Sequence, residues 1–474
     1  MSYDLNLIKD YVGLSAGLVV KNPATGEEIA TVKDWSVLET EDAIERANIA
    51  FKSWSAKTAK ERAGILRKWF ELILENQEAL AQLCTAECGK PVFESRGEVA
   101  YAASFIEWFA EEGKRIYGDV IPSHADGKRI LTLKQPIGVV AAITPWNFPL
   151  AMITRKVGPA LAAGCTAVVK PAEATPLSAY ALQALAIEAG VPEDVLQTIT
   201  TNNAADVGGV FTSHPIIKKV TFTGSTAIGK LLMKQSADTV KKVSMELGGN
   251  APFIVFDDAD IDAAVAGAMV SKYRNAGQTC VCANRFYIHE NIHDEFVAKF
   301  QAAIENLNVG NGADDGVDIG PVINTAAVDK ISELVASAKA DGANVVLGGE
   351  KHDAGESYFA PTLITGVTMN MEIANSEIFG PVATIFKFKE EAEVIAMAND
   401  TPYGLACYFY CNDLGRVWRV AEGLEYGIVG INEGIISTEV APFGGVKESG
   451  IGREGSKYGI DDYVEIKYCL MGGL

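Results

Sequence analysis

The spacing of apolar residues divides the chain into a helical N-terminal part and a longer part in which strands and helices alternate. Residues 58–118 place Leu66, Trp69 and Phe105 at helical spacing, which predicts long amphipathic helices. The aromatic residues of this stretch are better explained as core than as cofactor contacts. The tripeptide Gly89-Lys90-Pro91 predicts a break between the helices, because glycine and proline end helical segments.

From residue 137 onward, short apolar runs alternate with helical stretches. Continuous apolar runs of this length suit strands that are buried on both faces. Strands and helices in this rhythm predict an α/β fold with parallel, doubly wound sheets. The predicted strands span residues 137–143, 166–169, 195–200, 219–223, 252–256 and 285–288, and the predicted helices span residues 150–163, 176–190, 224–235, 261–273 and 293–306.

The run Gly248-Gly249-Asn250 falls between two groups of these elements, so it predicts a boundary between two lobes with a cleft between them. Two further segments, 128–134 and 462–470, fit neither lobe. Both are short and alternate between apolar and polar residues, and Val464 and Ile466 share one face of the second segment. Amphipathic strands outside the lobes predict a flap that pairs with another subunit.

Composition and charge limit the classes of function. The chain has 474 residues, 48% of them apolar, and a formal net charge of −20, which fits a globular protein of two or three domains. The acidity disfavours nucleic acid and anionic membranes as partners. No apolar run approaches the ~20 residues of a membrane span, and the N-terminus lacks the pattern of a targeting sequence.

Cysteine usage indicates the compartment and argues against a metal centre. Eight cysteines in so long a chain form no disulfide framework, so we expect a reducing cytoplasm. The pairs Cys84/Cys88 and Cys407/Cys411 have no histidine-rich neighbours, and the chain has only five histidines. We therefore expect no structural zinc site.

The segment Gly277-Gln278-Thr279-Cys280-Val281-Cys282 carries the strongest candidate chemistry. It places two thiols one residue apart, after a helical run and a polar turn that contains glycine. A thiolate is a strong nucleophile that attacks an electrophilic carbon directly. The alternative is that both cysteines are small buried hydrophobic residues, as most free cysteines are.

Two strand ends carry polar groups that suit this chemistry. In Thr144-Pro145-Trp146-Asn147-Phe148-Pro149, the prolines fix the turn, and the Asn147 amide can donate to a developing oxyanion. A helix-capping asparagine is the alternative. Glu246 ends an apolar strand before two glycines, where burial would raise the pKa of its carboxyl group and suit a general base. An ion-paired structural glutamate is the alternative.

Two other strand ends have features of nucleotide sites. In Thr223-Gly224-Ser225-Thr226, Gly224 permits close backbone approach, and Ser225 can cap a helix that faces an anion. Lys170 and Glu173 follow another strand at the edge where ligands bind, and a carboxylate there can accept from both ribose hydroxyls. Neither strand end carries G-x-G-x-x-G, and a capped helix with a solvated Lys-Glu pair explains the same patterns.

Seven motifs in order resemble the aldehyde dehydrogenase superfamily from about residue 10 to the C-terminus. They are Pro-Trp-Asn-Phe-Pro, Lys-Pro-Ala-Glu, Phe-Thr-Gly-Ser, Glu-Leu-Gly-Gly, Gly-Gln-Thr-Cys, Glu-Ile-Phe-Gly-Pro (377–381) and Pro-Phe-Gly-Gly (442–445). Within that superfamily, residues 105–115, 273–285 and 452–460 look like the succinate-semialdehyde dehydrogenase branch.

The resemblance implies how the fold is divided. A Rossmann-like NAD-binding domain would comprise residues 1–122 and 140–247, and a catalytic domain would comprise residues 248–445. Residues 123–139 and 446–474 would bridge the domains and join subunits in a homodimer or a homotetramer.

The resemblance also implies a mechanism. Cys280 would attack the aldehyde to give a thiohemiacetal, with its oxyanion held by the Asn147 amide and the Cys280 backbone N–H. Hydride transfer would leave a thioester, and Glu246 would activate the water that releases the acid. NAD is expected over NADP, because the Glu173 carboxylate would repel a 2′-phosphate. The implied cofactor residues are Thr144, Pro145, Trp146, Lys170, Glu173, Thr223, Gly224, Ser225, Leu247, Glu377 and Phe379.

The implied substrate is succinate semialdehyde, whose carboxylate would bind Arg155, Arg274 and Ser437. The alternative for each arginine is a surface ion pair. Glutarate semialdehyde competes as substrate, because one methylene changes binding by only about 1–3 kcal/mol. Oxidation of a different aldehyde, a catalytically silent structural role and thiol-dependent hydrolysis also compete with this function.

The second thiol, Cys282, agrees with the succinate-semialdehyde branch. Side chains two residues apart in an extended segment share a face, so we expect oxidation to join Cys280 and Cys282 in a reversible disulfide. A packing role for Cys282 is the alternative.

Overall fold

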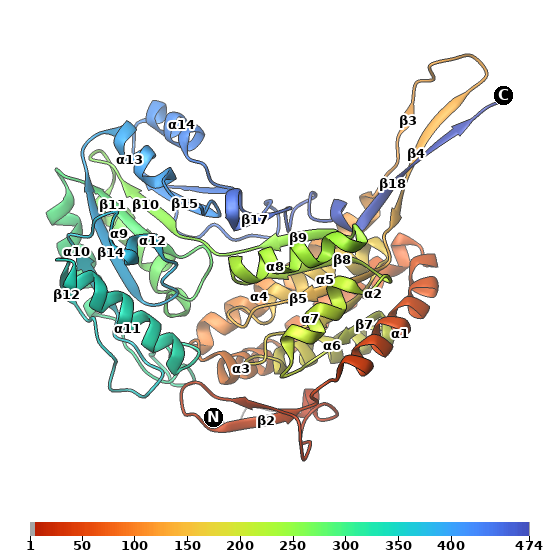
Figure 1. The fold of residues 1–474 in the computed structure, drawn as a ribbon, viewed down its shortest axis with the longest axis horizontal. Helices are drawn as coiled ribbons and strands as arrows, with labels where there is room; N and C mark the ends of the chain where they lie inside the picture. Colours follow the sequence, from red (N-terminus) through yellow and green to blue (C-terminus); the bar gives the residue numbers. More distant parts are fainter. Residues whose placement is uncertain (1–4, 474) are drawn as a thin grey trace.

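Two α/β lobes and a protruding arm make up the computed structural model, which describes residues 5–473 (Figure 1). The α/β fold and the two doubly wound lobes predicted from the alternation of apolar runs are confirmed. No helix within residues 5–473 is both long and apolar enough to cross a bilayer.

The first lobe is built on a six-stranded sheet with the strand order β17-β9-β8-β5-β6-β7. Its strands are parallel except β17, which runs antiparallel to β9 and comes from near the C-terminus. The strands are β5 (Val139–Ile143), β6 (Thr166–Lys170), β7 (Leu196–Thr198), β8 (Ile217–Thr223), β9 (Lys242–Glu246) and β17 (Gly450–Ile451).

Alternate residues of β5 face the two sides of this sheet, as the pleat of a strand requires. Val139 and Ala141 belong to one apolar core, whereas Val140 and Ala142 belong to the other. The first side is covered by helices α1 (Val37–Ala56), α7 (Ala204–Ser213) and α8 (Thr226–Ser236). The second side is covered by helices α2 (Ala59–Glu75), α3 (Gln77–Cys88), α4 (Val92–Glu112), α5 (Ala151–Ala163) and α6 (Leu177–Ala189).

The second lobe is built on a seven-stranded sheet with the order β12-β13-β14-β11-β10-β15-β16, in which only β12 is antiparallel. Its strands are β10 (Ala251–Val255), β11 (Ala283–His289), β12 (Asn344–Leu347), β13 (Thr362–Thr365), β14 (Val382–Phe388), β15 (Ala406–Tyr410) and β16 (Ile428–Ile431). Its helices are α9 (Ile261–Tyr273), α10 (His293–Glu305), α11 (Thr325–Ala340), α12 (Glu372–Asn375), α13 (Glu391–Asn399) and α14 (Leu414–Gly423).

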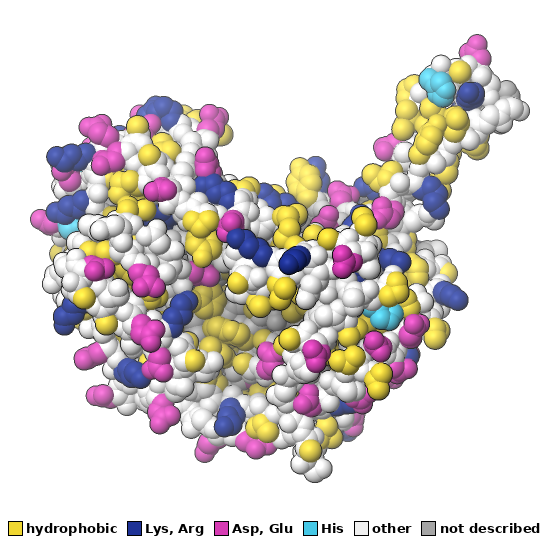
Figure 2. All heavy atoms as spheres, in the orientation of Figure 1, with side chains coloured by type: hydrophobic (Ala, Val, Ile, Leu, Met, Phe, Trp, Pro, Cys, Tyr) yellow, Lys and Arg dark blue, Asp and Glu magenta, His cyan; other side chains and the backbone are white. Residues whose placement is uncertain are grey.

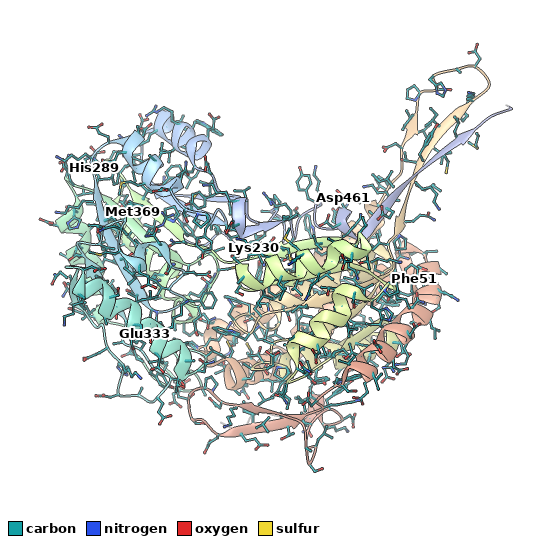
Figure 3. The ribbon with its side chains drawn as sticks, viewed as in Figure 1. Phe51, Lys230, His289, Glu333, Met369 and Asp461 are labelled. Carbon is teal, nitrogen blue, oxygen red and sulfur yellow. The ribbon has the colours of Figure 1, made fainter. Side chains whose placement is uncertain are left out.

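The arm extends from the first lobe as a three-stranded antiparallel sheet, β18-β4-β3 (Figure 1). The two amphipathic segments that fitted neither lobe pair with each other in it, with Ile466 opposite Lys134. At its base, Lys134 lies 2.9 Å from Asp461, which Figure 3 labels. Hydrophobic side chains gather on its surface in Figure 2, and Ile466 is 68% exposed. The strands are β3 (Val120–Ile121), β4 (Arg129–Pro136) and β18 (Val464–Met471), and a separate hairpin, β1 (Leu18–Lys21) and β2 (Glu28–Val32), lies near the N-terminus.

The C-terminal segment 446–474 belongs only partly to the arm. Gly450 pairs with Glu246 at the edge of the first sheet, and Ile460 and Tyr463 lie in the core of the first lobe. The chain therefore returns to the first lobe before β18 leaves it.

Helix α7 was not predicted from the sequence, because Gly208 and Gly209 lower its intrinsic helix propensity. Val207 and Phe211 are buried against the sheet, and the Asn203 side chain caps the helix by accepting from the Asp206 N–H. Tertiary packing outweighs the local preference here.

Candidate functional site

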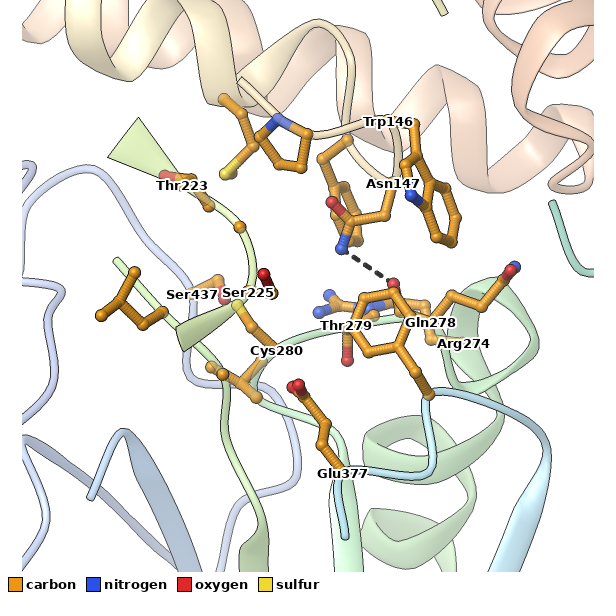
Figure 4. A pocket seen from close by; sticks show the side chains of 18 of the residues that line it. Trp146, Asn147, Thr223, Ser225, Arg274, Gln278, Thr279, Cys280, Glu377 and Ser437 are labelled. Atoms are coloured by element: carbon orange, nitrogen blue, oxygen red, sulfur yellow. Dashed lines mark hydrogen bonds between the residues drawn. The ribbon is translucent and has the colours of Figure 1, made fainter. Parts of the chain in front are cut away.

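The loop after β5 carries Asn147 to the floor of a cavity between the lobes. The Asn147 side chain is buried, and its Nδ2 donates to the Gln278 carbonyl of the second lobe at 2.9 Å (Figure 4). The Asn147 backbone carbonyl accepts from Lys90 Nζ at 2.6 Å. Lys90 is itself fully buried and paired with Glu98 at 2.5 Å, and Glu98 accepts from the Leu150 N–H that begins α5. The loop is thus held in place at Asn147 and at Leu150.

Cys280 lies in a tight turn between α9 and β11, and Figure 4 shows it facing the cavity. A hydrogen bond of 3.0 Å from the Cys282 N–H to the Thr279 carbonyl closes this turn. Burial raises the pKa of the Cys280 thiol to about 12, and Arg155 is the strongest influence in the opposite direction. The carboxylates of Glu377 and Glu246 raise the same pKa further. At neutral pH the sulfur therefore carries its proton.

The glycines after β9 make room for this turn. A Cβ atom on Gly249 would lie 2.3 Å from the Cys280 carbonyl oxygen, closer than any real side chain is found. The group that these glycines admit is the backbone of the candidate nucleophile.

Glu246 ends β9 with its carboxyl group buried and unpartnered. Neither carboxyl oxygen has a hydrogen-bond partner within residues 5–473. Burial first, and then the neighbouring Glu454, raise the pKa of Glu246 well above its usual value, while Arg155 and Lys156 lower it. Gly444 approaches so closely that a Cβ there would lie 3.0 Å from Glu246 Oε1. A buried carboxyl group without a partner is costly to keep, and it is free to accept from water or a thiol.

The cavity has a volume of about 300 Å³. It brings together many residues that the sequence singled out at widely separated positions. The predicted residues on its wall are Asn147, Cys280, Pro145, Trp146, Thr223, Gly224, Ser225, Leu247, Glu377, Phe379, Arg155, Arg274 and Ser437. Thr144, Lys170, Glu173, Glu246 and Cys282 are not on this wall.

One end of the cavity has the donor set of a dinucleotide site. The Thr223 hydroxyl group on this wall is buried without a partner among the described residues, as is the hydroxyl group of Thr144, the residue before Pro145 of the wall. Ser225 caps α8 by accepting from the Ile228 N–H, so the positive end of this helix opens beside the cavity. These groups fit the phosphates and hydroxyls of a nicotinamide dinucleotide.

Glu377 and Phe379 close the same end of the cavity. Glu377 accepts from the Gly249 N–H at 2.9 Å, and burial raises its pKa to about 7. Phe379 has a φ of 59°, a strained value for a non-glycine residue, and its ring meets Trp146 edge to face at 5.5 Å. Strain of this kind persists where the surroundings fix the backbone, as they do at ligand sites.

Lys170 and Glu173 pair with each other beyond this end of the cavity. Lys170 Nζ lies 2.5 Å from Glu173 Oε1 at the carboxyl end of β6. The lysine is buried, whereas the glutamate side chain is 44% exposed. Glu173 therefore remains accessible, although part of its charge is neutralised.

The opposite end of the cavity is cationic. Arg155 lies 3.1 Å from Glu454 and stacks over Phe443 at 3.9 Å, so its charge is already paired, although its Nε and Nη2 make no hydrogen bond within the described residues. Arg274 begins a 3₁₀ turn directly after α9, and its buried Nε has no partner among the described residues. Ser437 lines the same cavity.

A second cavity of about 480 Å³ continues from this cationic end. It shares Tyr101, Phe148, Arg274 and Ser437 with the first. Exposed Phe93 and Val270 lie at its outer part. The arrangement gives a small molecule a route to Cys280 from the side opposite the dinucleotide end.

Cys282 is directed at a buried lysine. Its Sγ lies 3.4 Å from Lys272 Nζ, and the same lysine donates to Asn284 at 3.1 Å. Our expectation of an extended segment was wrong, because the backbone needs a turn to bring Cys280 toward the cavity while β11 begins at Ala283. The disulfide between Cys280 and Cys282 stays a prediction. Among residues 5–473, no cluster of His, Cys, Asp and Glu could hold a metal ion.

Several cavity residues were not identified from the sequence. Tyr101 and Met152 lie on α4 and α5, where the apolar periodicity marks core, and Phe443 was noted only as part of a motif. Lys330 comes from α11 and donates to the Glu377 carbonyl at 2.8 Å. A linear pattern carries no signal that such helix positions border a cavity.

Comparisons with known proteins agree over almost the whole chain. Residues 13–469 match the model of the aldehyde dehydrogenase family. A glutarate-semialdehyde dehydrogenase of Pseudomonas aeruginosa is 61% identical, with 96% of this chain and 94% of the relative covered. A succinate-semialdehyde dehydrogenase [NADP(+)] of Escherichia coli is 60% identical, with the same coverage of both chains. The crystal structure of a succinate-semialdehyde dehydrogenase from Burkholderia pseudomallei has a TM-score of 0.97 at 57% identity and covers 99% of each chain.

Proposed function

The chain belongs to the aldehyde dehydrogenase family, and we propose that it oxidises succinate semialdehyde to succinate with NAD. The observation that carries this proposal is one cavity with the Cys280 thiol between a dinucleotide-like end and a cationic end. The Nε of Arg274, which has no hydrogen-bond partner among the described residues, supports a substrate with a terminal carboxylate. The relatives named for succinate and glutarate semialdehydes support the same class of anionic aldehyde.

The first chemical step in the proposal is attack by the Cys280 sulfur on the aldehyde carbon. Because the thiol is protonated at neutral pH, it must lose its proton, and Arg155 is the cation that most favours the thiolate. The developing oxyanion would accept from the second N–H of the Asn147 amide, since the first is used by Gln278. The Cys280 backbone N–H would be the second donor.

The dinucleotide, when bound, supplies the hydride acceptor. Thr223 and Ser225 would hold it from the first lobe, which we assign as the NAD-binding domain (residues 1–122 and 140–247), and Glu377 would contact it from the second lobe. Cys280 comes from the second lobe, which we assign as the catalytic domain (residues 248–445). The oxidised carbon stays on Cys280 as a thioester, which water hydrolyses far more readily than it attacks a carboxylate.

Glu246 is the proposed base for this hydrolysis. Its unpartnered oxygens can accept from a water, and its raised pKa makes it a stronger base than an exposed glutamate. Arg155 and Lys156 keep part of its charge stabilised. The acid product leaves once the C–S bond breaks and Cys280 regains a proton.

The function is tested by following reduced nicotinamide with succinate and glutarate semialdehydes side by side. We expect NAD-linked oxidation of both, with the higher kcat/KM for succinate semialdehyde. Cys280→Ser should lose activity, because an alkoxide forms far less readily than a thiolate at neutral pH. A Cys280→Ser variant that retains native turnover contradicts the covalent mechanism, and a clear preference for glutarate semialdehyde replaces the proposed substrate.

Arg274 provides a test of the substrate class. Arg274→Ala should raise KM for succinate semialdehyde by roughly ten- to a hundredfold, because a charged hydrogen bond contributes about 1.5–3 kcal/mol. Arg274→Lys should restore little, since lysine cannot form the bidentate bond. Butanal has the same chain length without the carboxylate and is the matched control. Equal effects on both aldehydes would assign Arg274 a structural role instead.

Glu173 provides a test of the cofactor preference. Wild-type protein should show a higher kcat/KM with NAD than with NADP, because Glu173 opposes a 2′-phosphate, and Glu173→Ser should narrow that ratio. Glu193→Ser, in the 3₁₀ turn before β7 near the start of β6 and away from its carboxyl end, is the control and should leave the ratio unchanged. A wild-type preference for NADP would overturn this part of the proposal.

The arm is proposed to join copies of this chain in a homodimer or homotetramer. Ile466 and Tyr468 are 68% and 58% exposed, an unusual position for large apolar residues on an amphipathic strand. Ile466→Asp with Tyr468→Asp should lower the mass in light scattering toward one protomer. Val240→Asp, at a residue that is 91% exposed outside the arm, should not. A wild-type protein that is monomeric at micromolar concentration refutes the proposal.

A further inference from the structure

The segment before the nucleophile contains a run of unusual backbone conformations. Asn275 and Ala276 have φ values of 51° and 53°, and Gly277 follows at 75°. Left-handed conformations in consecutive non-glycine residues are strained, and they persist only where the surroundings over-determine them. This run leads directly into the turn that presents Cys280.

Contacts from both lobes hold the run in place. The two carboxylate oxygens of Glu94 accept from the Asn275 N–H at 2.8 and 3.1 Å. Gln278 Nε2 donates to the Asn275 carbonyl at 3.0 Å. Gly277 packs so closely that a Cβ there would lie 2.2 Å from the Gly380 carbonyl oxygen.

The Asn275 side chain reaches across to the candidate oxyanion donor. Its Nδ2 donates to the Asn147 backbone carbonyl at 3.0 Å and to the Gln278 carbonyl at 3.4 Å. Asn147 Nδ2 donates to that same Gln278 carbonyl at 2.9 Å. The backbone and the side chain of Asn147 are therefore both tied to the segment that carries Cys280.

The other atom of the Asn275 amide group makes no such contact. Its Oδ1 is buried and has no hydrogen-bond partner within residues 5–473. An unpaired buried oxygen lowers the stability of the fold, so stability alone does not account for an asparagine at this position. The two hydrogen bonds that the Asn275 Nδ2 group donates account for the asparagine.

We propose that Asn275 is a positioning residue that sets the Asn147 amide at the correct distance from the Cys280 sulfur. It reaches neither the substrate nor the cofactor wall, and it acts through Asn147. The proposal rests on the proposed roles of Cys280 and Asn147. It predicts that the loss of Asn275 harms reactions that pass through an oxyanion and spares those that do not.

Two reactions of Cys280 separate these effects in the full chain without dinucleotide. With p-nitrophenyl acetate, the sulfur bonds to the carbonyl carbon through a tetrahedral oxyanion, the C–O bond breaks, p-nitrophenolate leaves and the thiol proton goes to solvent. With iodoacetamide, the sulfur displaces iodide, and no oxyanion forms. The p-nitrophenolate burst and mass spectrometry of the Cys280 peptide measure the two rates.

Asn275→Gly is the principal variant, because glycine tolerates the left-handed backbone and lacks the side chain. We expect acylation to slow by roughly ten- to a hundredfold, as for misplaced catalytic groups, and alkylation to change less than about twofold. Asn275→Asp keeps nearly the same side-chain shape but lacks the N–H donor, so it replaces the glycine variant in both rate measurements if that variant fails to fold. Asn432→Gly, at an exposed asparagine with a φ of 52°, is the matched control and should leave both rates unchanged.

A double-mutant cycle tests whether Asn275 acts through Asn147. Asn147→Ala alone should slow acylation by about two to three orders of magnitude. Adding Asn275→Gly to the Asn147→Ala variant should slow acylation by less than about a further twofold, because the amide that Asn275 positions is already absent. Effects that multiply, or equal slowing of acylation and alkylation by Asn275→Gly, would overturn the proposal.

One further variant, Cys280→Ser, distinguishes failure of this inference from failure of the proposed function. If Cys280→Ser still gives the p-nitrophenolate burst, Cys280 is not the nucleophile and the proposed function fails. If Cys280→Ser abolishes the burst and the cycle with Asn275 shows independent effects, only the positioning role fails.

Discussion

The hydrogen bond from the Asn147 amide to the Gln278 carbonyl joins the two lobes at the point where the candidate chemistry takes place. Each lobe has its own core, so the distance between the loop after β5 and the segment before Cys280 depends on contacts that cross the cleft. This bond and the donation from Asn275 to the Asn147 carbonyl are two such contacts. A small rotation of one lobe would separate the amide from the sulfur, which makes these contacts a geometric requirement and not only a stabilising one.

Burial sets the acid–base character of the site. It is the largest cause of the raised pKa values of Cys280 and Glu246. Arg155 lowers the pKa of both groups. It is ion-paired with Glu454, and the charge of Glu454 raises the pKa of Glu246. The cation beside the two groups is therefore shared, so a change at Arg155 acts on the nucleophile and the base together.

The sequence predicted the fold where the pattern of residues is local. Helix α9 has the same ends in the structure as in the prediction, because Asp260 caps it and the apolar pattern is continuous to Tyr273. The pairing of β17 with β9 could not be predicted, since it joins residues about two hundred positions apart and β17 has only two residues. Backbone pairing of so short a strand leaves no periodicity to detect.

The candidate site was predicted where a motif follows a strand and was missed where a helix passes beside it. Asn147 and Cys280 lie in turns with distinctive composition. Tyr101 lies in a helix, where the spacing of apolar residues is the same whether a position faces the core or a cavity. The extended segment expected at Cys282 failed for a related reason. Three consecutive left-handed residues precede the turn at Cys280, and contacts with Glu94 of the first lobe, with Gln278 and with Gly380 hold them. Tertiary contacts fix the nucleophile turn, and a single segment of sequence does not contain them.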